Sequence, residues 1–192
     1  MPTRCSWLPA DRELYVKYHD EEWGVPSYDP RYLFEMICLE GAQAGLSWWT
    51  ILQKREHYRA VFHHFEPEIV AKMTDAELEK LVLDAGIIRH RGKIYSVRAN
   101  AQAWLALGEK EGDPVKWLWK FIGGKPRVNA RKVMSEVQTK TPESEAMSKA
   151  LRKVGFNFTG ATTMHAYMQG VGMVNDHTVD CVCYKGPLLT KG

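Results

Sequence analysis

The chain lacks any long hydrophobic run. No stretch of its 192 residues approaches the roughly 20 consecutive apolar residues that a membrane-spanning helix needs. The N-terminal letters MPTRCSWLPADREL contain scattered charges and no apolar segment of the kind found in a secretory signal. These absences argue against an integral membrane protein and against a secreted one. We therefore expect a cytoplasmic protein that has no membrane partner. We also expect it to act as a monomer.

Strand patterns, internal repeats and low-complexity segments are also missing. Apolar and polar residues do not alternate convincingly anywhere, whereas helical periodicity recurs along the chain. The expected fold class is therefore all-α. With 45% apolar residues the chain can bury a substantial core, either as one domain or as two closely packed lobes. We expect the tail, residues 185–192, to be disordered.

Neither sign of charge is in large excess. The sequence has 26 Lys and Arg against 23 Asp and Glu, which gives a net charge of +3. This balance is compatible with a nucleic-acid partner but is no evidence for one, because ordinary soluble proteins often show it.

Helix starts are the clearest local signals. Asp29 before Pro30 predicts an N-cap followed by the first helical residue, and an apolar face then runs to about Gln43. Thr74 and Glu77 have the spacing of a capping box. Residues 125–140 lack a clear period and are expected to form a loop with one helical turn. Similar signals predict further helices that begin near Ser47, Pro67, Gly92, Asp113-Pro114 and Thr141-Pro142.

The segment from Gly155 to Gly160 predicts a tight reversal between two helices. Glycine takes a positive φ without steric cost, and the two glycines bracket Phe156, Asn157, Phe158 and Thr159. The unpaired N–H groups at the start of the second helix could bind an anion such as a phosphate. Taken alone, however, the turn favours an ordinary hairpin of two helices.

Cysteine is scarce, with only Cys5, Cys38, Cys181 and Cys183 present. In a reducing compartment these are expected to be thiols or metal ligands and not disulfides. His177 and Cys181 are separated by three residues, and Cys5 with His19 would complete a Cys2His2 set. That composition is typical of a closed, tetrahedral, structural zinc site. Such a site would tie the two ends of the chain together.

The spacing leaves two alternatives open. Thirteen residues separate Cys5 from His19, which matches no standard zinc finger, so spacing alone favours four unconnected side chains. Cys183 also competes with Cys181 as the fourth ligand. Cys181 is favoured because an i, i+4 pair on a helix faces one way.

Aromatic residues are concentrated in the first part of the chain, near the acidic run Asp20–Glu22 and the isolated Glu40. Most tryptophans of a helical protein belong to its core, so packing explains each ring taken singly. Their density suggests another interpretation: a pocket of rings closed by one carboxylate suits a flat cationic ligand. The rings are Trp7, Tyr15, Tyr18, Trp23, Tyr28, Trp48 and Trp49.

Longer segments carry a resemblance that covers nearly the whole chain. They read YHDEEWGVP at 18–26, LFEMICLEG at 33–41, QAGLSW at 43–48, AGIIRHRGKI at 85–94 and VNDH at 174–177. Through these segments the sequence resembles the type I DNA-3-methyladenine glycosylases, which belong to the helix-hairpin-helix superfamily of DNA glycosylases. Runs of nine and ten residues are far more specific than a lone hairpin.

The resemblance implies an all-helical, two-lobed fold over residues 1–184. The chain ends would form a lobe that holds a structural zinc on Cys5, His19, His177 and Cys181, and roughly residues 30–150 would form the other lobe. It further implies that the hairpin Gly155–Gly160 grips double-stranded DNA. Leu46 is a candidate for the apolar plug that fills the base stack after a nucleotide is extruded, with a core leucine as the equal alternative. The implied base pocket consists of Glu40, which recognises the base, Tyr18 and Trp48, which stack on it, and Trp7, Tyr15 and Trp23.

The implied activity is hydrolysis of the N-glycosidic bond of 3-methyladenine in alkylated DNA after nucleotide flipping. Bifunctional superfamily members have a lysine just after the hairpin, where this chain has Ala161, Thr162 and Thr163, so we expect no lyase activity. The residue that activates water stays unassigned between Asp176, Asp180 and none, since Asp176 could equally cap the turn that carries His177.

Two clusters of basic residues, Arg89, Arg91 and Lys93 and then Lys149, Arg152 and Lys153, lie where the superfamily fold would place them near phosphates. Solvated helix faces explain most clusters of this kind.

Two other functions remain as alternatives. A non-catalytic DNA-binding module would need the hairpin but no charged pocket. A zinc hydrolase would need an open coordination position, which a four-ligand set lacks.

Overall fold

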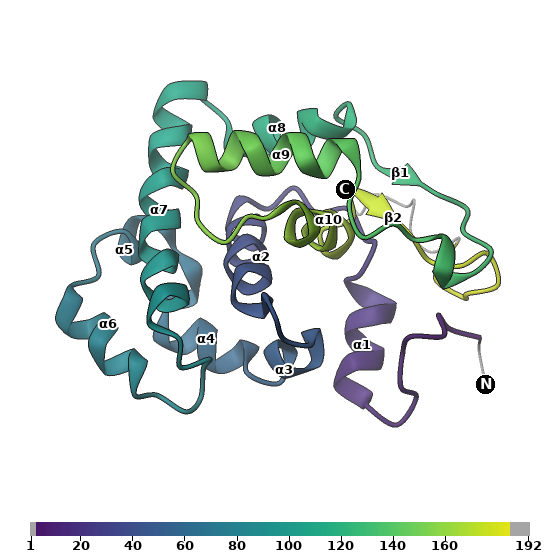
Figure 1. The fold of residues 1–192 in the computed structure, drawn as a ribbon, viewed down its shortest axis with the longest axis horizontal. Helices are drawn as coiled ribbons and strands as arrows, with labels where there is room; N and C mark the ends of the chain where they lie inside the picture. Colours follow the sequence, from purple (N-terminus) through teal and green to yellow (C-terminus); the bar gives the residue numbers. More distant parts are fainter. Residues whose placement is uncertain (1–2, 185–192) are drawn as a thin grey trace.

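The computed structural model describes residues 3–184, which fold mainly as α-helices (Figure 1). The predicted disordered tail, 185–192, lies outside these residues. Among the described residues no helix is both long and apolar enough to cross a membrane. The α-helices are α1 (Glu13–Glu21), α2 (Pro30–Gln43), α3 (Trp48–Leu52), α4 (Arg55–Val61), α5 (Pro67–Val70), α6 (Asp75–Val82), α7 (Arg91–Glu111), α8 (Pro114–Trp119), α9 (Pro142–Lys153) and α10 (Ala161–Gly170). Single 3-10 turns are η1 (His63–Phe65), η2 (Lys120–Ile122) and η3 (Met134–Glu136), and the strands are β1 (Arg127–Val128) and β2 (Val174–Asn175).

The predicted helix starts are confirmed by the capping bonds. The carboxylate of Asp29 accepts backbone N–H bonds at the start of α2, and Asp113 does the same at α8. Thr74 and Glu77 form a capping box on α6, and Thr141 caps α9. Each cap satisfies N–H groups that the first helical turn leaves without a partner.

Helix α2 is the central element of the core and packs against α3, α7, α8 and α10 (Figure 1). Leu33, Phe34 and Ile37 are fully buried, and the helix remains buried through Ala42. A helix that is covered on several sides has no solvated face, so a polar residue on it must lie inside the protein. Glu40 is such a residue, in the last turn of α2.

The pair of short strands was not predicted. β1 lies in the segment that we expected to be a loop, and it pairs in parallel with β2, with Arg127 opposite Val174 and Val128 opposite Asn175. Two-residue strands are too short to show an alternating pattern in the sequence. The predicted helical turn of this segment is present as η3, and the pairing holds the segment beside the C-terminal part of the chain.

The hairpin between α9 and α10 is confirmed, with one correction to its geometry. Gly155 has a φ of +102°, but Gly160 has an ordinary φ of −62°, and the second left-handed residue is Phe158. Asn100 of α7 holds the tip, since its side chain accepts from Asn157 N at 2.8 Å and donates to Asn157 O at 3.3 Å. Phe158 also packs on Gly41, one residue after Glu40, so the hairpin is fixed against the end of α2.

This difference between the two glycines predicts unequal effects of substitution. Gly155→Ala should lower the free energy of unfolding by about 1–2 kcal/mol, because a side chain disfavours the left-handed region. Gly160→Ala should lower it by less, under about 1 kcal/mol, because its φ suits any residue and a Cβ there would meet no atom closer than 3.5 Å, so only the poor N-cap preference of alanine counts. Urea unfolding of both variants measures this, and equal losses would contradict the described turn.

Candidate functional site

Five of the predicted pocket rings line one cavity of about 230 Å³, with Glu40 among its walls. Trp7 and Trp23 come from the segments that flank α1, and Tyr15 and Tyr18 come from α1 itself, while Trp48 begins α3. Pockets for drug-sized ligands are roughly 300–1,000 Å³, so the size suits a single flat ring system. The remaining lining residues are Gln43, Met134, Val137, Ala166 and Gln169.

The rings pack at tilted or edge-to-face angles around this cavity and do not fill it. The centroids of Trp7 and Trp23 are 5.0 Å apart at 75°, and those of Tyr18 and Trp48 are 5.3 Å apart at 44°. Such tilted pairs are favourable in themselves. They leave room beside Glu40 for a further ring.

Two rings of the predicted cluster lie elsewhere. Trp49 stacks on the ring of Tyr15, with centroids 5.7 Å apart, and does not line the cavity. Tyr28 stacks on Trp119, with centroids 4.4 Å apart, at a separate cavity of about 530 Å³. The charged residues that line this larger cavity are Lys116 and Lys120, which would repel a cation.

Glu40 is the only charged residue among those that line the smaller cavity. Its side chain is 3% exposed, and its Oε2 has no hydrogen-bond partner among the described residues. Burial raises the pKa of Glu40 to about 8. A carboxylate held in this way gains more from a cationic ligand than one that is already paired.

This raised pKa predicts a dependence of stability on pH. The folded state holds the Glu40 proton up to about pH 8, whereas the unfolded chain releases it near pH 4.5. The free energy of unfolding should therefore fall as the pH rises through this window, by on the order of a few kcal/mol. The variant Glu40→Gln should lose this part of the dependence and be the more stable protein at pH 8. Parallel pH profiles for both proteins, measured by urea unfolding, would contradict the assignment.

The acidic run near the rings has structural partners. Glu22 and the buried Glu35 both accept from Arg55, at 2.7 and 2.6 Å, so they form a buried ion-pair network. Asp20 accepts a bidentate bond from Arg4 and lies 2.7 Å from Nδ1 of His19. None of these three carboxylates lines the cavity, so Glu40 is the carboxylate that a ligand there would meet.

Sequence reasoning missed one wall of the cavity. Met134 and Val137 belong to the segment that we expected to be a loop, and α10 supplies Ala166 and Gln169. The spacing of three residues within each pair places both members on one side of a helical turn. That signal could have been read from the sequence, but nothing in it says which side faces the rings.

Leu46 lies on the surface. Its side chain is 41% exposed, in a turn where Gly45 has a φ of +79°. The alternative that Leu46 is a core leucine is therefore wrong. In the sequence Leu46 lies between the cavity residues Gln43 and Trp48.

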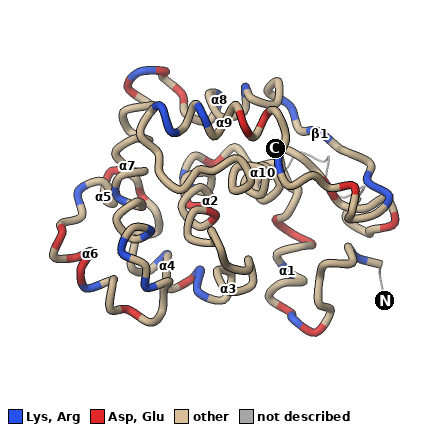
Figure 2. Tube along the Cα trace, in the orientation of Figure 1, with Lys and Arg blue, Asp and Glu red and all other residues tan. Residues whose placement is uncertain are grey.

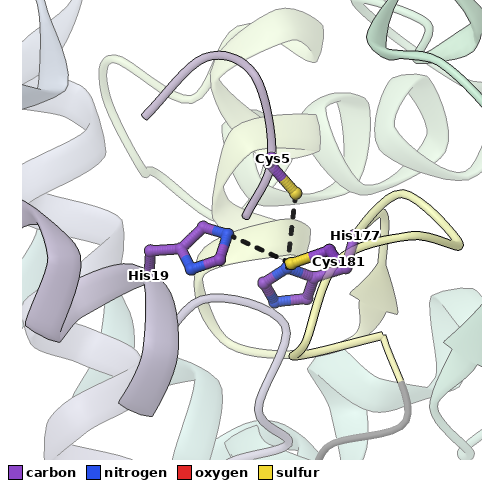
Figure 3. A group of neighbouring side chains, drawn as sticks. All are labelled: Cys5, His19, His177 and Cys181. Atoms are coloured by element: carbon purple, nitrogen blue, oxygen red, sulfur yellow. Dashed lines mark hydrogen bonds between the residues drawn. The ribbon is translucent and has the colours of Figure 1, made fainter. Parts of the chain in front are cut away.

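The four predicted metal ligands lie together although they come from opposite ends of the chain (Figure 3). Sγ of Cys181 is 3.4 Å from Nδ1 of His177 and 3.6 Å from Nε2 of His19, and Sγ of Cys5 is 3.5 Å from Nδ1 of His177. Tetrahedral bonds of about 2.3 Å to sulfur and 2.0 Å to nitrogen imply S···N distances of about 3.5 Å. All four side chains are buried, so the cluster could hold one metal ion and no water.

The surroundings of the two histidines fit this role. Nε2 of His177 lies 2.9 Å from the carbonyl oxygen of Trp23, and Nδ1 of His19 lies 2.7 Å from Asp20. Each bond places the ring proton on the nitrogen that faces away from the cluster, which is the usual arrangement around a metal. Burial lowers the pKa of His177 to about 4 and also lowers the pKa of His19, so both rings are neutral at pH 7 and offer a lone pair.

The structure corrects the reason for preferring Cys181. Residues 177–181 form a turn and not a helix, so i, i+4 spacing is not what brings His177 and Cys181 together. Cys183 lies outside the group of four, with its Sγ 3.6 Å from Asp20 and 3.9 Å from Nδ1 of His19.

Figure 2 shows Lys and Arg at the start of α7 and on α9. The side chains of these basic clusters differ in availability. Lys93 is buried and donates from Nζ to the carbonyl oxygens of Ala42 and Ala44, so it caps the end of α2 and is unavailable to a phosphate. Arg91 is paired with Glu79 on the surface. Arg89 is exposed, as are the three basic residues of α9 that lead into the hairpin, Lys149, Arg152 and Lys153.

Neither candidate aspartate lines the cavity. Asp180 is exposed in the turn next to Cys181, and the side chain of Asp176 is fully buried. Asp176 does not cap the turn that carries His177, because Asn175 accepts the backbone N–H of that residue at 3.0 Å.

A mainly helical fold with a small cavity of rings around one buried carboxylate defines a protein suited to bind a flat cation. Comparisons with known proteins give the family. The family model for methyladenine glycosylases matches residues 7–184. The sequence is 54% identical over 184 residues to DNA-3-methyladenine glycosylase 1 of Escherichia coli K12, which covers 95% of this chain and 97% of the relative. The chain belongs to the methyladenine glycosylase family.

Solved structures agree with this assignment. A crystal structure of 3-methyladenine DNA glycosylase I superposes with a TM-score of 0.92 at 49% identity, over 94% of this chain and 99% of that one. A structure that describes 3-methyladenine recognition by 3-methyladenine DNA glycosylase I from Staphylococcus aureus gives a TM-score of 0.90 at 36% identity, over 93% and 95% of the two chains. The fold is thus that of these enzymes.

Proposed function

We propose that this protein is a monofunctional DNA glycosylase that hydrolyses the N-glycosidic bond of 3-methyladenine in alkylated double-stranded DNA. The observation that carries this proposal is Glu40, a buried carboxylate without a partner in a cavity of rings. Family membership and the names of the relatives support it.

Charge explains how the site would select its substrate. Adenine methylated at N3 is cationic within DNA, so it attracts both the faces of Tyr18 and Trp48 and the carboxylate of Glu40. Neutral adenine brings no positive charge that would favour the ionised form of Glu40, so Glu40 keeps its proton and the charge-assisted contact is not formed. A damaged nucleotide is also cheaper to extrude from the stack than a paired one, by a few kcal/mol at most.

The same charge explains the chemistry. The glycosidic bond to a cationic base is already weak, and the base leaves as a neutral molecule, so strong acid catalysis is unnecessary. We propose attack by water through an oxocarbenium-like transition state, without a covalent intermediate. Neither Asp176 nor Asp180 reaches the cavity wall, so we assign no residue to the activation of water. Ala161, Thr162 and Thr163 follow the hairpin where a lyase would need its lysine.

We propose that DNA lies across the hairpin and the turn at Leu46. The hairpin Gly155–Gly160, with Phe156, Asn157, Phe158 and Thr159, would bind the backbone through N–H groups at the start of α10. Lys149, Arg152 and Lys153 would add charge beside it. Leu46 would fill the gap in the base stack.

We propose that Cys5, His19, His177 and Cys181 hold one structural zinc ion. When bound, zinc supplies a cross-link between the two chain ends and no reaction chemistry, because four protein ligands leave no position for water. The chain would then act as a monomeric unit of two lobes. The segments around the cluster would form one lobe, and roughly residues 30–150 would form the other.

Methylated duplex DNA tests the proposed activity. We expect the wild-type protein to release free 3-methyladenine above the buffer background, detected by chromatography of the released bases. The strand should stay intact until heat or alkali is applied, since no lyase step follows. If tight binding to alkylated DNA is found without release of base, the protein is a recognition module and the proposal is wrong.

A further inference from the structure

One wall of the cavity carries a polar group without an assigned role, the side-chain amide of Gln169. Gln169 lies on α10 and lines the cavity together with Glu40. Its Nε2 donates to Oδ2 of Asp176 at 2.9 Å, whereas no described residue bonds its Oε1. The amide therefore has one occupied end and one available end.

Asp176 determines which end of the Gln169 amide faces the cavity. Its fully buried carboxylate accepts from Nδ2 of Asn129 at 2.9 Å and from Nε of Arg131 at 3.1 Å, both on Oδ1. The other oxygen, Oδ2, accepts from Gln169 and also lies 3.7 Å from Nε2 of the buried His165, which is beyond hydrogen-bond distance. A carboxylate in an ion pair with arginine only accepts hydrogen bonds, so Gln169 must turn its NH2 group toward it. The carbonyl oxygen of Gln169 is then the atom that the amide can offer to the cavity.

The polarity of this wall has a chemical consequence. The carbonyl oxygen of Gln169 is an acceptor, so a base that meets it gains most when its edge donates. Adenine carries an amino group at position 6, which donates, whereas guanine and hypoxanthine carry an oxygen there, which accepts. A buried acceptor that faces another acceptor loses its hydrogen bond and is disfavoured.

We propose that Gln169 is a specificity-determining residue that selects 6-amino over 6-oxo purines, and that Asp176 is the positioning residue that sets its amide as an acceptor. This inference rests on the proposed function and adds to it a preference among methylated purines.

Asp176→Asn is the informative variant because it should invert the amide. Two donors, Asn129 and Arg131, hold the position of Oδ1, so the oxygen of the new asparagine must stay there. Its NH2 group then faces Gln169, which can accept only by rotating its carbonyl oxygen toward it. Gln169 would offer NH2 to the cavity instead, and the preference for an amino group should be lost or reversed.

The test uses the free bases 3-methyladenine and 3-methylhypoxanthine, which differ in the group at position 6. Trp7, Trp23 and Trp48 line the cavity, so tryptophan fluorescence reports binding. We expect the wild type to prefer 3-methyladenine by roughly tenfold or more, in line with about 1–2 kcal/mol for one such hydrogen bond. The preference is the Kd for 3-methylhypoxanthine divided by the Kd for 3-methyladenine. Asp176→Asn should lower this ratio by at least tenfold. Gln169→Leu should bring the ratio near one.

Asp180→Asn is the matched control, since Asp180 is exposed and is the neighbour of the proposed ligand Cys181, as Asp176 is the neighbour of the proposed ligand His177. It should keep the wild-type ratio, and bound metal is measured in each variant. The inference is overturned if the wild type binds both bases equally, or if Asp176→Asn and Gln169→Leu keep the wild-type ratio. If Asp176→Asn does not fold, Gln169→Leu decides alone. Release of 3-methyladenine from DNA by the wild type tests the proposed function separately, so either can fail without the other.

Discussion

Cys5→Ala and Cys181→Ala are each expected to yield a protein without stoichiometric metal and with a melting temperature at least about 10 °C lower. Each change removes one of four ligands that lie within bonding geometry of a single ion. Structural zinc contributes roughly 10–16 kcal/mol to the folding of small zinc fingers. This chain has a separate core, so we expect a smaller loss of several kcal/mol, at about 2–4 °C for each kcal/mol.

Cys183→Ala is the matched control for these variants. Cys183 is two residues from Cys181 but lies outside the cluster, beside Asp20. It should retain the metal and melt within a few degrees of the wild type. Elemental analysis of the purified proteins, followed by calorimetry, makes the comparison. A metal-free wild type, or retention of metal by Cys5→Ala and Cys181→Ala, means that the cluster does not bind an ion.

Glu40→Gln is expected to reduce the excision of 3-methyladenine by about a hundredfold or more while leaving the protein folded. The amide keeps the shape of the side chain but removes the charge that would face the cationic base. Loss of one aligned electrostatic contact at an enzyme site costs about 10²–10³ in rate. Single-turnover release of base from methylated DNA measures the effect, and the pH profile of unfolding shows that the variant is intact.

Glu56→Gln serves as the control for charge removal alone. Glu56 is exposed on α4 and is paired with Arg59. It does not line the cavity. It should excise base at the wild-type rate. Equal rates for Glu40→Gln and the wild type would show that Glu40 has no part in recognition, whatever its burial.

Local sequence signals predicted the helices well because their causes are local. Asp29, Thr74 and Thr141 each bond N–H groups within three residues of themselves, so a short window of sequence contains both partners. The hairpin was predicted for the same reason. Its second left-handed residue was not, because Phe158 is held in that conformation by packing on Gly41, more than a hundred residues away.

For the metal cluster, the residue types predicted the set of four side chains correctly, but the sequence spacing gave a wrong reason for one of them. A Cys2His2 set was identified from residue types and from the resemblance, and the structure brings those four side chains together. The helical spacing used to choose between Cys181 and Cys183 was the wrong reason, since residues 177–184 contain no helix. What selects Cys181 is the turn after β2, which depends on the pairing of β2 with β1.

The cavity was only half predictable. Its rings and Glu40 stand out by composition, but Met134 and Val137 come from an irregular segment whose position depends on long-range bonds from Asn129 and Arg131 to Asp176. Contacts between residues more than forty positions apart leave no local pattern. The role proposed for Gln169 depends on Asp176, only seven residues away, but the orientation of Asp176 is in turn set by Asn129 and Arg131.

The most direct test of the account is a crystal structure of this protein with free 3-methyladenine. We predict the purine in the cavity that Tyr18 and Trp48 line, in contact with both rings, with one of its N–H groups about 3 Å from the carboxylate of Glu40. Binding beside Tyr28 and Trp119, with the rings around Glu40 closed on themselves, would contradict it.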